Sequence, residues 1–194
     1  MTDLIIREVS RSFNGKKVLD RFSAELRQGK RYCLMAPSGA GKTTLLRILA
    51  GLDTGYTGSI EGLSGCRITM QFQEDRLLEH LDAADNIRFV SPGIPLTEIE
   101  TALSVVGLSA ENRQPVGEYS GGMQRRVSLV RALLYPADLL LLDEPFTGLD
   151  KASLEKAVRF LLERSSGKTL LFTTHLEEEA RRCGAKILHL WNGV

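Results

Sequence analysis

The segment Ala36–Thr44, APSGAGKTT, constrains this chain more than any other part of its sequence. It matches the phosphate-binding loop pattern, G-x-x-x-x-G-K-[ST], except that Ala36 stands in place of the first glycine. That pattern requires a strand before the loop and a helix after it. Residues 31–35 are predicted to be a strand, and apolar residues recur at helical spacing from Lys42 onward. We therefore predict a phosphate-binding loop made of Ala36, Pro37, Ser38, Gly39, Ala40, Gly41, Lys42, Thr43 and Thr44.

The chemistry of phosphate binding explains these residue types. Backbone N–H groups of a glycine-rich turn form a hollow that binds anions, and the following helix adds its positive end. Lys42 can reach the β- and γ-phosphates of a nucleotide, and the Thr43 hydroxyl can bind Mg²⁺. The extra methyl of Ala36 is tolerated if its φ angle is negative. The loop alone leaves kinase, GTPase and ATPase activity open.

Composition narrows the class of protein. Of 194 residues, 43% are hydrophobic, and 25 basic against 24 acidic residues give a net charge of +1. Such a chain is expected to fold, as one compact domain or as a core with an insertion. A charge this close to zero argues against a simple basic nucleic-acid binder.

Strands are predicted to alternate with helices along the chain, which favours an α/β fold with a mainly parallel sheet. Residues 59–60 and 67–72 flank the glycine-rich piece GLSG and are expected to form a short hairpin. Strands are expected at residues 4–9, 18–26, 31–35, 59–60, 67–72, 138–142, 169–174 and 186–190, and helices at 42–51, 83–89, 97–106, 120–134, 151–164 and 176–183.

A pair of acidic residues follows an apolar strand. Asp143 and Glu144 come directly after four leucines at residues 139–142. A buried strand that ends in aspartate places a carboxylate at the sheet edge where ligands bind in α/β folds. Asp143 fits a magnesium ligand, and Glu144 can accept a proton from an attacking water. This second carboxylate favours hydrolysis over transfer to an alcohol, whereas a strand-end acid beside a solvated glutamate is the alternative.

No membrane or secretion signal is expected. The most apolar stretch, residues 129–142, contains an arginine, a proline and an aspartate, and the first ten residues contain two acids. Cys33, Cys66 and Cys183 are widely spaced, and we predict buried free thiols in a reducing compartment.

Ser120, Gly121 and Gly122 lie between the phosphate-binding loop and the acidic pair. They match the centre of the LSGGQ signature of the ATP-binding cassette (ABC) family, with Tyr119 in place of Leu and Met123 in place of Gln. The chain therefore resembles the nucleotide-binding subunit of an ABC transporter over nearly its whole length. This resemblance implies a P-loop NTPase (RecA-like) core, an N-terminal antiparallel β subdomain and an inserted helical subdomain. Residues 1–73 and 135–194 would form the core and residues 74–134 the helical subdomain of one ABC ATPase domain, 1–194.

The resemblance implies roles for four more residues, each with a structural alternative. Phe13 matches the aromatic that stacks on adenine, although aromatic residues usually belong to a core. Gln73 matches a ligand of Mg²⁺ and of the attacking water, or is an exposed strand end. Asp150 matches the loop that communicates across the dimer, or is a helix N-cap. His175 matches the histidine that contacts the γ-phosphate, or is structural.

The resemblance also implies a mechanism. Two subunits would close head-to-tail around two ATP molecules, each held between Lys42 and Thr43 of one chain and Ser120–Gly122 of the other. Glu144 would polarise the water, while Lys42, His175 and Mg²⁺ stabilise the transferring group. Thr43, Gln73 and Asp143 would be the Mg²⁺ ligands.

Short strings indicate the branch of the family. FQEDRLL with Asn86-Ile87, SGGM and DEPF are similar to importer ATPases of the nitrate/sulfonate/taurine type. This likeness implies a peripheral subunit at the cytoplasmic face of the membrane, bound to a permease and, through the complex, to an extracytoplasmic solute-binding protein. Residues 74–86 are expected to form the groove for the permease, or else a solvated helix face.

Two other functions remain open. The first is a soluble ABC-type ATPase, for instance in iron–sulfur assembly, that is not coupled to transport. The second is a regulatory module that binds but does not hydrolyse ATP, and the presence of Glu144 and His175 argues against it. No nucleic-acid partner is expected.

Overall fold

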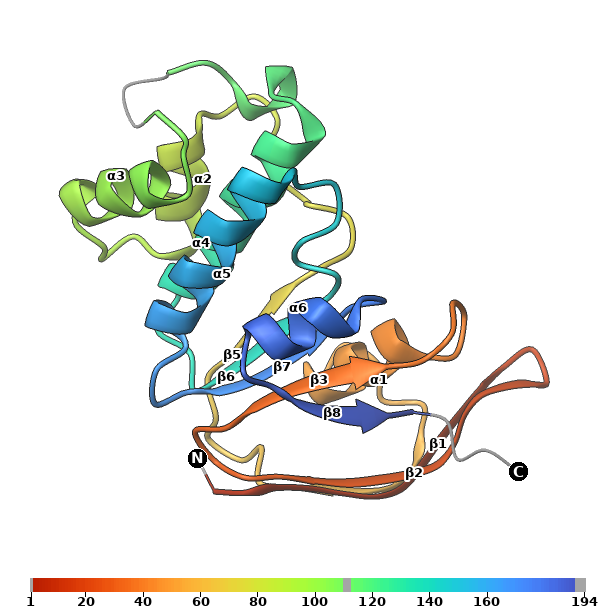
Figure 1. Ribbon diagram of the computed structural model, residues 1–194. Coiled ribbons are helices and arrows are strands. Elements are labelled where there is room, and N and C mark those ends of the chain that lie inside the picture. The colour runs from red at the N-terminus through yellow and green to blue at the C-terminus, as the bar shows by residue number, and fades with distance from the viewer. Residues whose placement is uncertain (1, 110–112, 191–194) are drawn as a thin grey trace. The chain divides into compact units, whose positions relative to one another are not determined.

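The computed structural model describes residues 2–109 and 113–190. By their internal contacts, the residues group into two compact units (Figure 1). The first unit comprises residues 1–70, 137–144 and 167–194, and the second comprises residues 71–136 and 145–166. The division into core and helical subdomain stays a prediction, and each unit is described by itself below.

An antiparallel sheet in the first unit has the strand order β2-β1-β4. Its strands are β1 (Leu4–Phe13), β2 (Lys16–Leu26) and β4 (Thr57–Glu61). Asn14 and Gly15 join β1 to β2 with φ angles of 48° and 78°, the left-handed conformation that a two-residue hairpin turn requires. The expected N-terminal antiparallel β subdomain is confirmed.

A five-stranded sheet has the order β5-β6-β7-β3-β8. The strands are β5 (Ile68–Gln71), β6 (Leu139–Leu142), β7 (Thr169–Thr173), β3 (Arg31–Met35) and β8 (Lys186–His189). β3 pairs in parallel with both β7 and β8, and β6 pairs in parallel with β7. All four leucines of β6 are buried, as expected for a strand covered on both faces. The predicted α/β fold with a mainly parallel sheet is confirmed.

Helices α1 (Lys42–Leu49) and α6 (Glu177–Arg182) belong to the same unit. The apolar face of α1 enters one hydrophobic core with residues of β1, β2, β3, β6 and β7. The helix therefore packs against both sheets, which fixes the direction of its N-terminus. α6 lies on the face of the parallel sheet away from the three-stranded sheet (Figure 1).

The second unit is helical. It contains α2 (Ala83–Val90), α3 (Leu96–Val105), the 3₁₀ turn η1 (Val116–Glu118), α4 (Gly121–Leu134) and α5 (Lys151–Arg164). α4 and α5 run side by side, and Arg164 of α5 bonds Glu98 of α3 at 2.7 Å (Figure 1). Side chains of Asp82, Ser120 and Asp150 cap α2, α4 and α5.

The hairpin expected around GLSG is wrong. β4 belongs to the antiparallel sheet and β5 to the parallel sheet, so the glycine-rich piece carries the chain from one sheet to the other. Gly62 has φ 95°, and a Cβ there would lie 2.3 Å from the backbone oxygen of Asp3. This glycine thus permits a close approach to β1 instead of a two-strand turn.

The structure also tests the expectations for the cysteines and for a membrane-spanning helix. All three cysteines are free; Cys33 and Cys183 are buried as predicted, but Cys66 is partly exposed. In the described part of the chain, no helix has the length and apolarity needed to cross a bilayer.

Candidate functional site

The loop between β3 and α1 has the backbone of a phosphate-binding hollow. Gly39 and Gly41 have φ angles of 76° and 92°, and a Cβ on Gly41 would lie 2.6 Å from the backbone oxygen of Val18. Gly41 therefore has to be glycine for both conformation and space. Ala36 is not among the residues with positive φ, so its methyl group is tolerated in place of the first glycine.

Lys42 begins α1 and is only 7% exposed. Its ammonium group donates to the carbonyl oxygens of Ala36 at 2.8 Å and Pro37 at 3.1 Å. These carbonyls hold the positive charge over the loop, where it adds to the field of the backbone N–H groups and of the helix N-terminus. The loop is therefore suited to a polyanion such as the triphosphate of a nucleoside triphosphate.

Asp143 follows β6 and is 1% exposed. Its carboxylate accepts the hydroxyl of Thr43 at 2.6 Å and that of Thr173 at 2.7 Å. Thr43 and Asp143, both predicted as Mg²⁺ ligands, thus bond to each other within one unit, and their binding of Mg²⁺ stays a prediction. Thr173, which ends β7, was not predicted, because only the sheet order reveals that β7 lies beside β6.

Glu144 has a left-handed backbone, with φ 49°. Such a conformation costs a residue other than glycine about 1–3 kcal/mol and often marks a functional site. Its backbone N–H donates to Thr173 Oγ1 at 2.9 Å, and its Oε1 lies 2.6 Å from Nε2 of His175. The Glu144 side chain is 14% exposed and that of His175 is 48% exposed. A carboxylate held beside a solvent-facing imidazole can accept a proton from a bound water.

A buried carboxylate supports the segment that carries His175. The Thr174 hydroxyl donates to Glu179 of α6, and the backbone N–H of Leu176 donates to Thr174 Oγ1 at 3.1 Å. These bonds fix the backbone on both sides of His175. Glu179 was not predicted, since a glutamate in the run Glu177–Glu179 has no sequence signal that separates it from solvated neighbours.

Replacing Glu179 by glutamine is expected to reduce the pH dependence of stability. Burial raises the pKa of the Glu179 carboxyl, as does the charge of Glu144, while bonding to Thr174 and the charge of Arg182 lower it. A raised folded-state pKa stabilises the fold most below the ordinary value of about 4.5, and this contribution is lost as pH rises through the folded value. Urea unfolding between about pH 4 and 8 should therefore show a flatter profile for Glu179→Gln. Glu177→Gln, an exposed change on the same helix, is the control, and equal slopes for all three proteins would contradict the prediction.

Phe13 ends β1 and is 43% exposed, so it is not a core residue. It lines a pocket of about 570 Å³ together with Thr43 and Thr44 of α1. The ring therefore borders the same hollow as the end of the phosphate-binding loop.

Three predicted sites lie in the second unit. Gln73 is exposed, and its backbone oxygen accepts a hydrogen bond from the guanidinium of Arg125. The same guanidinium donates to the backbone oxygen of Phe72 at 2.9 Å and forms an ion pair with Asp75 at 3.0 Å. Arg125 thereby anchors the segment after β5, a function the sequence did not reveal. The residues 72–82 form a loop, so the alternative of a solvated helix face for residues 74–86 is wrong up to the start of α2.

Ser120 and Asp150 are both helix caps. Ser120 Oγ accepts from Met123 N at 3.3 Å, and Asp150 accepts from Ser153 N at 2.9 Å. Gly121 and Gly122 form the first turn of α4, and a Cβ on Gly122 would lie 3.2 Å from the oxygen of Gly148. The structure thus shows the alternative role of Asp150 as a helix N-cap, and the roles of all these residues toward a second subunit stay predictions.

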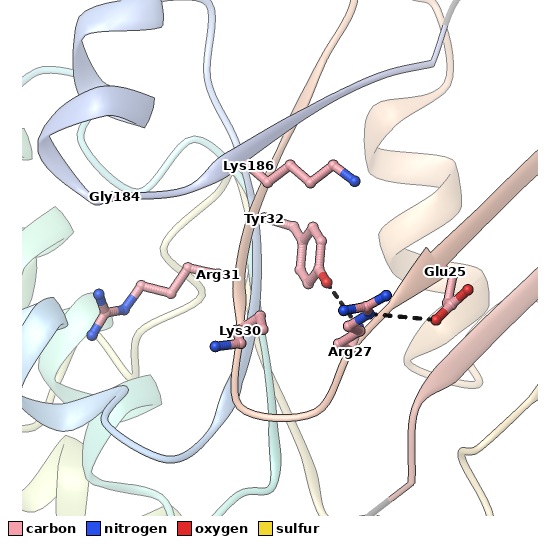
Figure 2. A pocket seen from close by; sticks show the side chains of 7 residues that line it. All are labelled: Glu25, Arg27, Lys30, Arg31, Tyr32, Gly184 and Lys186. Atoms are coloured by element: carbon pink, nitrogen blue, oxygen red, sulfur yellow. Dashed lines mark hydrogen bonds and ion pairs between the residues drawn. The ribbon is translucent and has the colours of Figure 1, made fainter.

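A second hollow, of about 470 Å³, lies where β3 and β8 begin (Figure 2). Four of its seven lining residues are basic, but their side chains do not converge. Lys30 and Arg31 extend to one side of β3, whereas Arg27 and Lys186 extend to the other with Tyr32 (Figure 2). Glu25 lies 3.7 Å from Arg27 and offsets its charge. This hollow lies at the opposite strand ends from the phosphate-binding loop and has no focused anion site.

Known proteins resemble this chain in sequence and in fold. The family model described as ABC transporter matches residues 19–147. An aliphatic sulfonates import ATP-binding protein of Streptomyces avermitilis is 39% identical over 96% of this chain and 72% of its own. A taurine import ATP-binding protein of Roseobacter denitrificans is 36% identical over 97% of this chain and 77% of its own. The dimeric bacterial ABC transporter cassette MJ0796 superposes with a TM-score of 0.83 over 96% of this chain and 94% of its own, at 23% identity, and supports the fold.

Proposed function

Because the chain belongs to the ABC transporter family, whose cassettes bind and hydrolyse ATP, we propose that it is the ATPase subunit of an importer. The observation that best supports this proposal is a cluster of side chains within the first unit. Lys42 lies on the loop, Thr43 bonds to Asp143, and Glu144 lies beside His175. The two relatives described above are import ATP-binding proteins, one for aliphatic sulfonates and one for taurine. We therefore prefer import of a small solute such as a nitrate-, sulfonate- or taurine-like compound to a soluble, transport-independent ATPase.

In the proposed reaction, the charged side chains act on the phosphates or on the attacking water, and Phe13 acts on the base. The loop and Lys42 bind the β- and γ-phosphates, and Lys42 and His175 stabilise the negative charge that shifts during transfer. Glu144 orients the water and accepts its proton, with its carboxylate held by His175 at 2.6 Å. Phe13 stacks on the adenine ring, because its exposed ring borders the pocket that reaches Thr44.

The residues around Asp143 fit a Mg²⁺ ion. Thr43 Oγ1 and Asp143 Oδ2 are oxygen donors 2.6 Å apart, and Mg²⁺ in nucleotide sites commonly uses one or two such groups plus phosphates and water. When bound, Mg²⁺ neutralises charge on the β- and γ-phosphates. Thr43 and Asp143 would hold it, and Gln73 is proposed as a further ligand.

The proposal extends to partners. A second copy would supply Ser120–Gly122 at the N-terminus of α4, where small residues and a positive helix end suit a phosphate. Asp150 would contact the same dimer interface, and the dimeric cassette MJ0796 supports an assembly of this kind. The chain would lie at the cytoplasmic face of the membrane, bound to a separate integral membrane permease that provides the pathway. An extracytoplasmic solute-binding protein would complete the complex.

Uptake in cells that lack this gene tests the proposal. Radiolabelled taurine, an alkanesulfonate, sulfate and nitrate are offered, and the gene is returned as wild type or as Glu144→Gln. The wild type alone should restore uptake of one of these solutes, and the tagged chain should co-purify with an integral membrane protein. If returning the wild-type gene changes the uptake of none of the four solutes and only soluble proteins co-purify, the import function is overturned and the ATPase assignment stays intact.

A further inference from the structure

Arg11 and Phe13 lie two positions apart on β1, so their side chains share a face of the strand. The guanidinium carbon of Arg11 is 4.2 Å from the centre of the Phe13 ring. A cation over an aromatic face at this distance is attracted by the ring's negative surface. One face of Phe13 is therefore covered by Arg11.

Arg11 is itself held in place from the loop that follows α1. Its Nε donates to Asp53 Oδ2 at 3.0 Å, and its Nη1 donates to the backbone oxygen of Ser12 at 3.1 Å. The side chains of Arg11 and Asp53 are only 22% and 12% exposed. An ion pair shielded to this degree is screened less than one at the surface, so it can fix a side chain.

The loop around Asp53 is built to accommodate this guanidinium. The backbone N–H of Gly55 donates to Asp53 Oδ1 at 3.0 Å, which orients the carboxylate. A Cβ on Gly55 would lie 2.7 Å from Nη1 of Arg11, so a larger residue would displace the side chain. The bond from Arg11 also keeps the pKa of Asp53 low, so that the carboxylate stays charged.

These residues line one pocket with the end of the phosphate-binding loop. Arg11, Phe13, Asp53 and Gly55 border the hollow of about 570 Å³ that also includes Thr43 and Thr44. With one face under Arg11, Phe13 remains 43% exposed, which leaves ring surface for a second stacking partner. The hollow thus has a phosphate end and an aromatic end.

We propose that Arg11 is a positioning residue for the nucleotide base: anchored by Asp53, it fixes the Phe13 ring from one face so that the other face stacks on adenine. The inference rests on the proposed ATP site and adds a residue that decides affinity without touching the phosphates. Holding the ring before ATP arrives lowers the entropy that stacking would otherwise cost. Arg11 should therefore influence ATP binding and KM, and should leave the hydrolytic step itself alone.

Arg11→Met, which keeps the apolar stem and removes the guanidinium, is the first test. It should raise the Kd and KM for ATP by about five- to thirty-fold, with kcat within about two-fold of the wild type. Binding of inorganic tripolyphosphate, which has no base, should not change. Arg7→Ala is the control, because Arg7 lies on the same strand, six positions before Phe13, in an exposed pair with Glu61 at 3.6 Å.

A double-mutant cycle separates positioning from a general structural effect. Phe13→Ala should weaken ATP binding, and Arg11→Met should add little to it in the double variant, since Arg11 acts through the ring. Asp53→Asn should give a smaller loss in the same direction. Melting curves of all variants confirm that they are folded.

The opposite results have distinct meanings. Unchanged or tighter ATP binding by Arg11→Met would overturn the inference, and tighter binding would mean that Arg11 occupies the face the base needs. An equal loss of tripolyphosphate binding would also overturn it, because the change would then act on the loop. If the wild type itself neither binds nor hydrolyses ATP, the proposed function fails; if it does both and Arg11→Met behaves like Arg7→Ala, only the positioning of the base fails.

Discussion

Replacing Glu144 by glutamine is expected to lower ATP turnover by about 10²- to 10⁴-fold, because the amide cannot accept the proton of the attacking water. The substitution keeps the size of the side chain and the left-handed backbone at φ 49°. ATP binding should remain, so the closed dimer should accumulate with uncleaved ATP. Phosphate release and gel filtration with ATP measure the two effects.

One control variant and one further active-site variant accompany this test. Glu155→Gln changes an exposed glutamate on α5 and should leave turnover unaltered. His175→Ala should also slow turnover, since it removes the group 2.6 Å from the Glu144 carboxylate. Turnover of Glu144→Gln within about two-fold of the wild type would refute the assignment of Glu144 as the general base.

Replacing Lys42 by alanine should act earlier, on nucleotide binding. The change removes a charge that is 7% exposed and held over the loop by the carbonyls of Ala36 and Pro37. Charge-assisted bonds from lysine to phosphate contribute about 1.5–3 kcal/mol each, so a loss of about 10²-fold in ATP affinity is expected when more than one bond is lost. Isothermal titration with ATP and with tripolyphosphate provides the measurement, and both ligands should bind weakly.

A matched lysine controls for charge. Lys17→Ala removes an exposed lysine that pairs with Asp20 at 3.0 Å and should bind ATP like the wild type. Loss of ATP binding in both variants would point to a global effect of charge or folding. Wild-type affinity in Lys42→Ala would remove Lys42 from the binding site.

Much of the fold follows from local sequence patterns. The strand Arg31–Met35 and the helix Lys151–Arg164 begin and end at the predicted residues, because apolar spacing and caps define them locally. The phosphate-binding loop and the two acids after β6 were also visible, since each depends on a short motif followed by a regular element. The glycine-rich piece after β4 was misjudged because a glycine cluster marks a tight path of the backbone without showing which strand it leads to.

The residues that support the site were not predictable. Thr173 bonds both Asp143 and the backbone of Glu144 across two neighbouring strands, 30 and 29 positions away. Arg11 and Asp53 are 42 positions apart, and nothing in either local sequence indicates that they form a pair. Such partners depend on the order of strands and on loop paths, which the periodicity of one chain does not determine.

The left-handed backbone of Glu144 limits how the thermal stability of this protein can be raised. Glycine would adopt φ 49° without steric cost, so it is the residue that thermostability alone would favour at this position. Glycine has no carboxylate, so the change would remove the group that we propose as the general base. We therefore expect Glu144→Gly to relieve the backbone strain and raise thermal stability but to abolish ATP hydrolysis. Stabilising changes are better sought elsewhere in the chain.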